Sequence, residues 1–121
     1  MDLAAFQRGV ALFNNAEFFA AHEVLEDVWR DAAGPQKKYL QALIQIAVAF
    51  YHHGNGNCVG ARSLLARAVR NLDGCPDVFF GIQLSLLRHS LAKWQEALNG
   101  SASVTPPLPR LEPSKDNSQS D

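Results

Sequence analysis

The chain has 121 residues, of which 47% are hydrophobic and 19% charged, with a formal net charge of −1 at pH 7. This composition is ordinary for one globular domain and excludes a largely disordered chain. A net charge near zero offers no overall field for nucleic acid or an anionic membrane, and no apolar run is long enough for a transmembrane helix. Because the N-terminus lacks the layout of a signal peptide, we expect a cytoplasmic protein in which Cys58 and Cys75 are free thiols.

Apolar residues recur at helical spacing through most of the chain. The spacing predicts five helices, at about residues 2–13, 16–32, 36–53, 58–72 and 84–98. The third is the most apolar, so we expect it to be central in a helical bundle. Asparagines precede two of the helices, and we expect Asn14 or Asn15 to cap the second helix and Asn57 to cap the fourth.

The composition changes after Gly100, where Ser, Pro and charged residues become dominant. Four prolines within residues 106–113 forbid a helix, so we expect residues 1–100 to form one all-α domain and residues 101–121 to be a flexible, disordered tail. The sequence predicts no strand. Phe79 and Phe80 lie in a predicted loop, where they either close one end of the bundle or form a subunit contact, as in a homodimer.

Charge is distributed unevenly along the chain. Residues 1–33 hold six acidic and two basic side chains, a net of −4, whereas residues 34–100 hold three acidic and seven basic ones, a net of +4. The two regions complement each other if they pack together. The alternative is an anion-binding patch of Arg62, Arg67 and Arg70, which we favour less because no aromatic platform accompanies these arginines. We therefore expect no nucleic-acid partner.

Polar residues interrupt the apolar stripe of the second predicted helix. On a helical wheel His22 and Glu26 fall inside the stripe, one turn apart, while Glu23 and Arg30 lie at its polar edge. A carboxylate in an apolar stripe costs free energy unless it is paired or hydrogen-bonded. Glu26 is therefore the most informative residue of the chain.

The third predicted helix carries a matching polar strip. Gln41, Gln45 and His52 share one narrow face of this helix. Short connections make consecutive helices antiparallel neighbours, so the two polar faces can meet. We then expect a buried polar cluster with Tyr51 or Glu23 near its rim; its members are His22, Glu26, Gln45 and His52.

Three functions fit such a cluster. His22, Glu26 and His52 are candidate ligands of a divalent metal, the only cofactor that the pattern suggests. A small polar ligand is the second candidate, and it would be bound by His22, Glu26, Gln45 and His52 with Arg30 at the edge. Catalysis is the third, in the form of metal-assisted hydrolysis with Glu23 or Glu26 as the base. A di-iron carboxylate site is disfavoured because the chain has no Glu-x-x-His pair.

A non-enzymatic role stays open as the alternative. The cluster can be a structural hydrogen-bond network that fixes how the helices pack. The protein is then an interaction module, and its partner docks on the Phe79–Phe80 loop or on the arginine face. Solvent access separates the two interpretations, because a binding site must be open whereas a structural network is sealed and saturated.

The motif that contains these residues resembles a protein family. The stretch FNNAEFFAAHEVLEDVWR has a Phe-Asn, an aromatic pair and then His-Glu-x-x-Glu-x-x-Trp, and it resembles domain-of-unknown-function family 309 (DUF309), small bacterial and archaeal proteins. LQALIQ with Tyr51-His52, and Gly81-Ile82, resemble two later blocks, so the resemblance covers about residues 3–98. It implies a compact all-α fold and no particular activity. The family's signature falls on His22, Glu23, Glu26, Trp29, Gln45 and His52.

Overall fold

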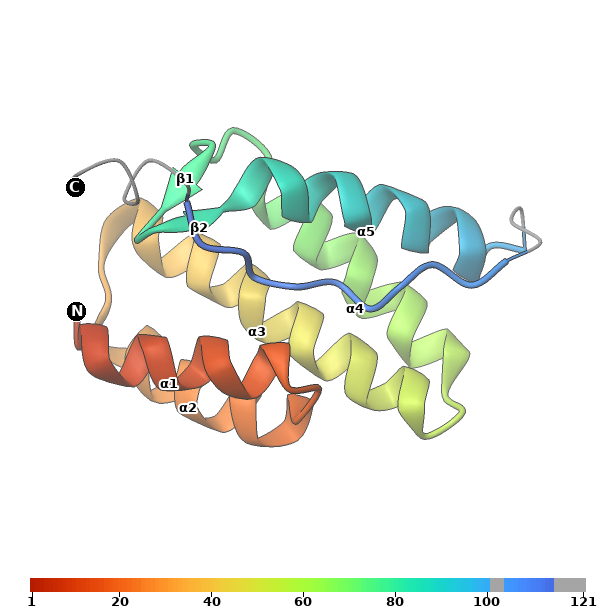
Figure 1. Cartoon of the computed structure of the whole chain (residues 1–121), viewed down its shortest axis with the longest axis horizontal. Helices are drawn as coiled ribbons and strands as arrows, with labels where there is room; N and C mark the ends of the chain where they lie inside the picture. Colours follow the sequence, from red (N-terminus) through yellow and green to blue (C-terminus); the bar gives the residue numbers. More distant parts are fainter. Residues whose placement is uncertain (101–103, 115–121) are drawn as a thin grey trace.

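The computed structural model describes residues 1–100 and 104–114. Its five helices are α1 (Leu3–Asn14), α2 (Phe18–Asp31), α3 (Gly34–Gly54), α4 (Cys58–Asn71) and α5 (Leu84–Leu98) (Figure 1). This arrangement confirms the all-α prediction, and helix bounds differ from the predicted ones by at most about two residues. Among the described residues, no helix has both the length and the apolar character needed to cross a membrane.

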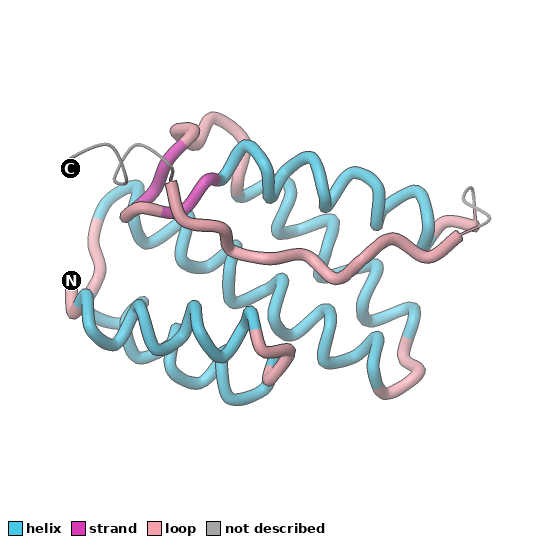
Figure 2. The backbone as a smooth tube through the Cα atoms, in the orientation of Figure 1, coloured by secondary structure: helices cyan, strands magenta, loops and turns pink. Residues whose placement is uncertain are grey.

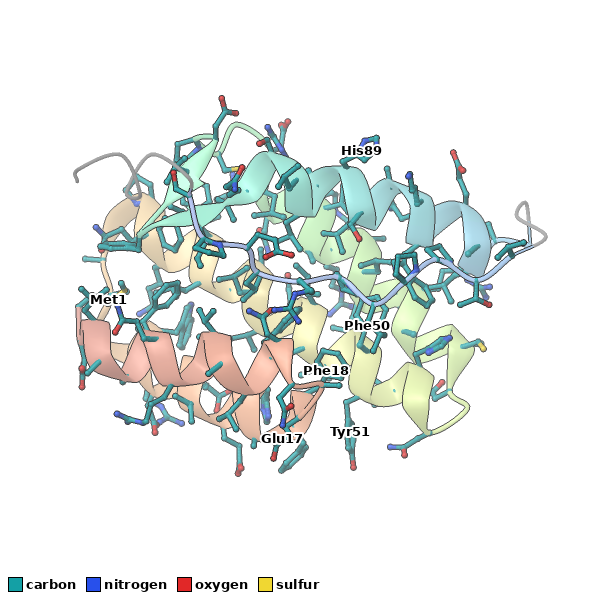
Figure 3. All side chains as sticks on the ribbon, viewed as in Figure 1. Met1, Glu17, Phe18, Phe50, Tyr51 and His89 are labelled. Atoms are coloured by element: carbon teal, nitrogen blue, oxygen red, sulfur yellow. The ribbon has the colours of Figure 1, made fainter. Side chains whose placement is uncertain are left out.

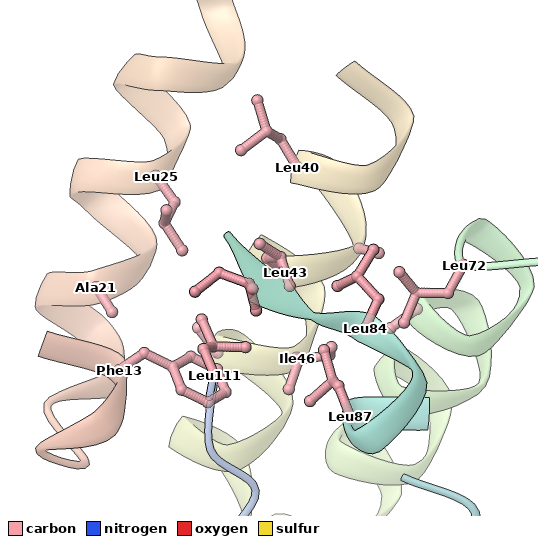
Figure 4. Close-up of a cluster of buried hydrophobic side chains, with 14 of the residues drawn as sticks. Phe13, Ala21, Leu25, Leu40, Leu43, Ile46, Leu72, Leu84, Leu87 and Leu111 are labelled. Carbon is pink, nitrogen blue, oxygen red and sulfur yellow. The ribbon is translucent and has the colours of Figure 1, made fainter. Parts of the chain in front are cut away.

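The helices pack as consecutive neighbours around one hydrophobic core. The central helix α3 contacts α2 on one side and α4 on the other, and α5 packs against α4 (Figure 1). Leu40, Leu43 and Ile46 of α3 are fully buried, together with Leu25 of α2 and Leu87 of α5 (Figure 4). The most apolar helix is therefore the central one, as the sequence predicts.

The predicted caps are confirmed in one place and wrong in another. The Asn57 side chain accepts a hydrogen bond from the Gly60 amide at 2.9 Å and caps α4. The residue that precedes α2, however, is Glu17, which makes no side-chain cap. Asn15 ends α1 instead, and Asn14 bonds a segment that lies 97 residues further along the chain. Local sequence could not reveal that competing partner.

A short β-hairpin joins α4 and α5, where the sequence predicts a loop. Its strands, β1 (Val78–Phe79) and β2 (Ile82–Gln83), pair antiparallel with Phe79 opposite Ile82 (Figure 2). The turn residues Phe80 and Gly81 have φ values of 48° and 82°. Positive φ at both positions is the geometry of a type I′ hairpin turn, in which a phenylalanine is unusual. Two-residue strands are also too short to produce an alternating sequence pattern.

Residues 104–114 form an extended segment, here named the C-terminal arm. The arm runs across the front of the bundle between α5 and α1 (Figures 1 and 2). It contains no helix, in agreement with its prolines, and its Leu111 is fully buried in the core. One apolar anchor and several backbone hydrogen bonds hold this segment, whose composition alone indicates disorder. The other residues of the predicted tail lie outside the described ones.

Candidate functional site

The polar pair on α2 lies side by side at the surface of the bundle. His22 Nε2 is 4.0 Å from Glu26 Oε2, and the two side chains are 21% and 42% exposed. This position corrects the expectation of a buried site. Their helical spacing brings them together as predicted, but the α2 face that reaches the core is made by Phe18, Ala21 and Leu25. The pair therefore stands beside the core and open to solvent.

The His22 ring is oriented by its own helix. Nδ1 lies 3.0 Å from the carbonyl oxygen of Phe19. A carbonyl can only accept, so Nδ1 carries a proton in this contact, and Nε2 is the ring nitrogen that faces Glu26. A backbone carbonyl that fixes the tautomer in this way is a common support for histidines that bind ligands through the other nitrogen.

Glu26 is shared between His22 and Arg30. Arg30 lies 3.3 Å from Glu26 Oε1 and also pairs with Asp27, one turn away on the same exposed face. These are surface ion pairs, which contribute little to the free energy of unfolding. The predicted role of Arg30 at the edge of the site fits this geometry, because Glu26 presents one oxygen to Arg30 and the other to His22.

The polar residues of α3 make contacts with other elements. The Gln45 side chain accepts a hydrogen bond from Asn71 of α4 at 2.9 Å. His52 Nδ1 lies 3.5 Å from the Asn57 amide nitrogen, next to the start of α4. The expected joining of these two residues with the α2 pair is therefore not seen, because this strip of α3 turns toward α4 rather than α2. In the described part of the chain, no three His, Cys, Asp or Glu side chains are grouped closely enough to hold a metal.

Two aromatic rings connect the two regions instead. The Phe19 ring lies 5.1 Å from the His22 ring and 5.2 Å from the Tyr51 ring, between centroids, and Tyr51 lies 6.0 Å from His52. Phe19 and Tyr51 are 49% and 40% exposed, and Tyr51 projects outward from α3 (Figure 3). We name Phe19, His22, Glu26 and Tyr51 the α2/α3 face. Phe19 lies at the flank of the apolar stripe of α2, and its exposure is the feature that sequence alone did not reveal.

The remaining predicted residues take simpler positions. Glu23 and Gln41 are exposed. Trp94 is buried in the core, whereas Trp29 is half-buried with the Lys37 ammonium 4.3 Å from its ring centroid. Phe79 is buried against Phe6, while Phe80 is 41% exposed at the hairpin turn.

The family resemblance is confirmed by comparison with known proteins. Residues 6–64 match the family model described as "Domain of unknown function (DUF309)". Residues 6–64 of the chain are therefore similar to DUF309 proteins. The match runs from α1 to the middle of α4, so it contains the whole α2/α3 face.

Two curated proteins are similar to this chain over part of their own length. The chain is 42% identical over 57 residues to "Uncharacterized protein YpuF" of Bacillus subtilis (strain 168). This match covers 46% of this chain and 33% of that protein. The chain is also 32% identical over 96 residues to an "Uncharacterized protein" of Aquifex aeolicus (strain VF5), covering 78% of this chain and 28% of that protein. The matched region thus spans about a third of each relative's length, and neither name assigns an activity.

Proposed function

We propose that the α2/α3 face binds a small cationic ligand, with Glu26 as its counter-ion and Phe19 and Tyr51 as its aromatic walls. The observation that carries the proposal is the exposed Phe19–Tyr51 ring pair next to the His22–Glu26 pair. Aromatic faces attract ammonium and guanidinium groups, and a carboxylate beside them adds charge complementarity. Such a ligand belongs to the class of small polar molecules that the sequence suggests.

The charges of α2 support a cation rather than an anion. Its exposed side holds four carboxylates against one arginine, since the charged residues are Glu23, Glu26, Asp27, Asp31 and Arg30. The Arg30 guanidinium already pairs with one oxygen of Glu26, which shows that a guanidinium group can reach this carboxylate. A ligand approaching over the rings meets the other oxygen of Glu26 and Nε2 of His22.

A divalent metal bound by His22, Glu26 and His52 remains a second candidate. The carbonyl-oriented His22 is the observation that favours it, because neutral imidazole with a fixed tautomer is a common metal ligand. His52 lies beside Asn57 and must move to become the third ligand. A base role of Glu23 or Glu26 in hydrolysis stays a prediction that depends on this metal.

An NMR titration tests the cation proposal. Methylguanidinium chloride is added to the full chain while the ring resonances of His22 and Tyr51 are followed, with sodium phosphate as the anion control. We expect saturable shifts of both rings with methylguanidinium alone. Glu26→Gln should weaken binding about tenfold, which corresponds to about 1.4 kcal/mol.

The matched control is Asp27→Asn. Asp27 also pairs with Arg30 but does not face His22, so this substitution should change the affinity by no more than about twofold. Equal losses in the two variants would mean that only the overall charge matters, and the absence of any saturable shift would also overturn the proposal. If zinc chloride instead shifts His22 and His52 together at one equivalent, the metal hypothesis replaces it.

A further inference from the structure

The bundle contains a groove that recognises an extended segment mainly through its backbone. We name this groove the arm groove, because the C-terminal arm occupies it. It is lined by Asn14 of α1, Gln83 of the hairpin and Trp94 of α5. Trp94 Nε1 donates to the Pro107 carbonyl at 2.8 Å. Asn14 donates to the Leu111 carbonyl at 3.1 Å and accepts from the Leu111 amide at 2.7 Å.

The hairpin holds the end of the arm in the manner of an added strand. The Gln83 amide donates to the Glu112 carbonyl at 2.9 Å, and the Gln83 side chain donates to the Pro113 carbonyl at 2.7 Å. Ile82 pairs antiparallel with Pro113. Addition of an extended segment to a strand edge is a known mode of peptide recognition, in which main-chain hydrogen bonds supply affinity and side-chain pockets supply specificity.

Buried side chains of the arm, Pro109 and Leu111, supply that specificity, and Leu111 reaches the core. Leu111 is fully buried and joins the core cluster of the bundle (Figure 4). The neighbouring Leu108 is 47% exposed. The prolines of the arm restrict it to extended conformations before it binds, so less conformational entropy is lost on docking. The bound unit is therefore an extended, proline-containing peptide with one leucine anchor.

The arm does not fill the space available to it. A pocket of about 410 Å³ remains beside Leu111, between α1 and the hairpin, and is lined mostly by apolar side chains, among them Phe6, Val10, Phe80 and Ile82. This open space lies next to the anchor position. A second segment can therefore begin to dock in this pocket before the resident arm has left.

We infer that the arm groove binds the C-terminal arm of a second copy, so that two chains exchange arms. The contacts above involve arm backbone atoms and Leu111, and none of them depends on the arm being attached to the same chain. Exchange of an identical element needs no new interface, which makes it a low-cost route to a dimer. The arm of the same chain competes at an effective concentration of about millimolar, so unmodified copies exchange only when concentrated.

Complementation between two full-length variants tests this inference without that competition. Leu111→Asp disables the arm but leaves the groove, because a buried carboxylate cannot replace the anchor. Asn14→Ala removes both hydrogen bonds to Leu111 and weakens the groove but leaves the arm. The intact arm of the second variant should enter the intact groove of the first. We expect the mixture to contain a 1:1 species of twice 13.3 kDa by light scattering, which neither variant forms alone.

Leu108→Asp is the control for charge in the arm. Leu108 is half exposed, so this variant should keep its own arm seated and form no complex with Asn14→Ala. Circular dichroism of each variant establishes that it is folded. Two folded variants that stay monomeric when mixed would overturn the inference. A dimer that also forms from Leu111→Asp alone would do the same, because it must use another surface.

A synthetic peptide of residues 104–114 provides a second measurement. Added to full-length Leu111→Asp, it should bind saturably and change Trp94 fluorescence, because Pro107 of the peptide reaches the indole N–H. A peptide carrying Leu111→Asp should bind at least about tenfold more weakly. If Leu111→Asp does not fold, Leu111→Ala serves as the milder receptor. Equal binding of the two peptides would show that the leucine anchor does not select the ligand and would contradict the inference.

Discussion

The side chain of Asn14 hydrogen-bonds both the amide and the carbonyl oxygen of Leu111, 97 residues away in the sequence. This two-point contact ties the end of α1 to the C-terminal arm. An asparagine amide supplies one donor and one acceptor, the same pair that a strand neighbour would offer. The relationship explains why a proline-rich segment without helix or long strand has a defined place on the bundle.

Loss of the arm anchor should destabilise the protein. Leu111→Ala removes a fully buried side chain and leaves a cavity, so we expect the free energy of unfolding to fall by about 2–4 kcal/mol. Leu108→Ala, at an exposed position of the same arm, should change it by less than about 0.5 kcal/mol. Urea unfolding followed by circular dichroism measures both. Similar small effects in the two variants would mean that the arm adds nothing to stability.

The close approach of α1 and α2 depends on Gly9. A Cβ added at Gly9 would lie 2.6 Å from Leu25 Cδ2, so Gly9→Ala forces the buried Leu25 to move. We expect a loss of about 1–3 kcal/mol in the free energy of unfolding. Gly54→Ala is the control, because nothing lies within 4 Å of the added atom and alanine favours helix. Gly54→Ala should be neutral or slightly stabilising by thermal unfolding, and a comparable loss at both glycines would contradict this interpretation of the packing.

Ala16 occupies a backbone conformation that suits glycine. Its φ is 62° in the connection between α1 and α2, which an L-residue with a Cβ adopts at a cost of about 1–2 kcal/mol. Ala16→Gly should therefore raise the free energy of unfolding by about 0.5–1 kcal/mol. The same substitution at Ala92, exposed within α5, should lower it by about 1 kcal/mol. Effects of the same sign at the two positions would be inconsistent with strain at Ala16.

The two cysteines should differ in reactivity. Cys58 is exposed, whereas Cys75 is buried, and burial raises the pKa of the Cys75 thiol above its ordinary value. Iodoacetamide should alkylate only Cys58 in the native protein at pH 8, so that mass spectrometry finds one label per chain. After denaturation it should alkylate both cysteines. Rapid double labelling of the native protein would contradict the burial of Cys75.

The raised pKa of Cys75 also has a consequence for stability. In the unfolded chain this thiol has its ordinary pKa, near 9.0, whereas burial disfavours its ionised form in the folded chain. The free energy of unfolding is therefore unaffected by this group below that pH and falls as the pH rises further. We expect the wild type to lose more stability than Cys75→Ala between about pH 8 and pH 10, as measured by urea unfolding. Parallel losses in the two proteins would assign the alkaline effect to other groups.

The α2/α3 face illustrates which part of a site can be inferred from sequence. His22 and Glu26 are one helical turn apart, and this spacing alone placed them together. Their exposure was not predictable, because the apolar stripe of α2 is wide enough to include them. Only the packing of Phe18, Ala21 and Leu25 decides which part of that stripe enters the core. Gln45 likewise turned toward Asn71 of α4 because α3 has neighbours on both sides.

The five helices, their order and the apolar character of central α3 can be inferred from local sequence, because helical periodicity and capping need no knowledge of distant residues. The sequence also identified the DUF309 motif on α2. Tertiary structure alone decided that Phe19 and Tyr51 meet on the surface, that Asn14 serves the arm rather than α2, and that Leu111 enters the core. Each of these contacts joins residues far apart in the chain, and its free energy depends on which surfaces the folded helices leave open.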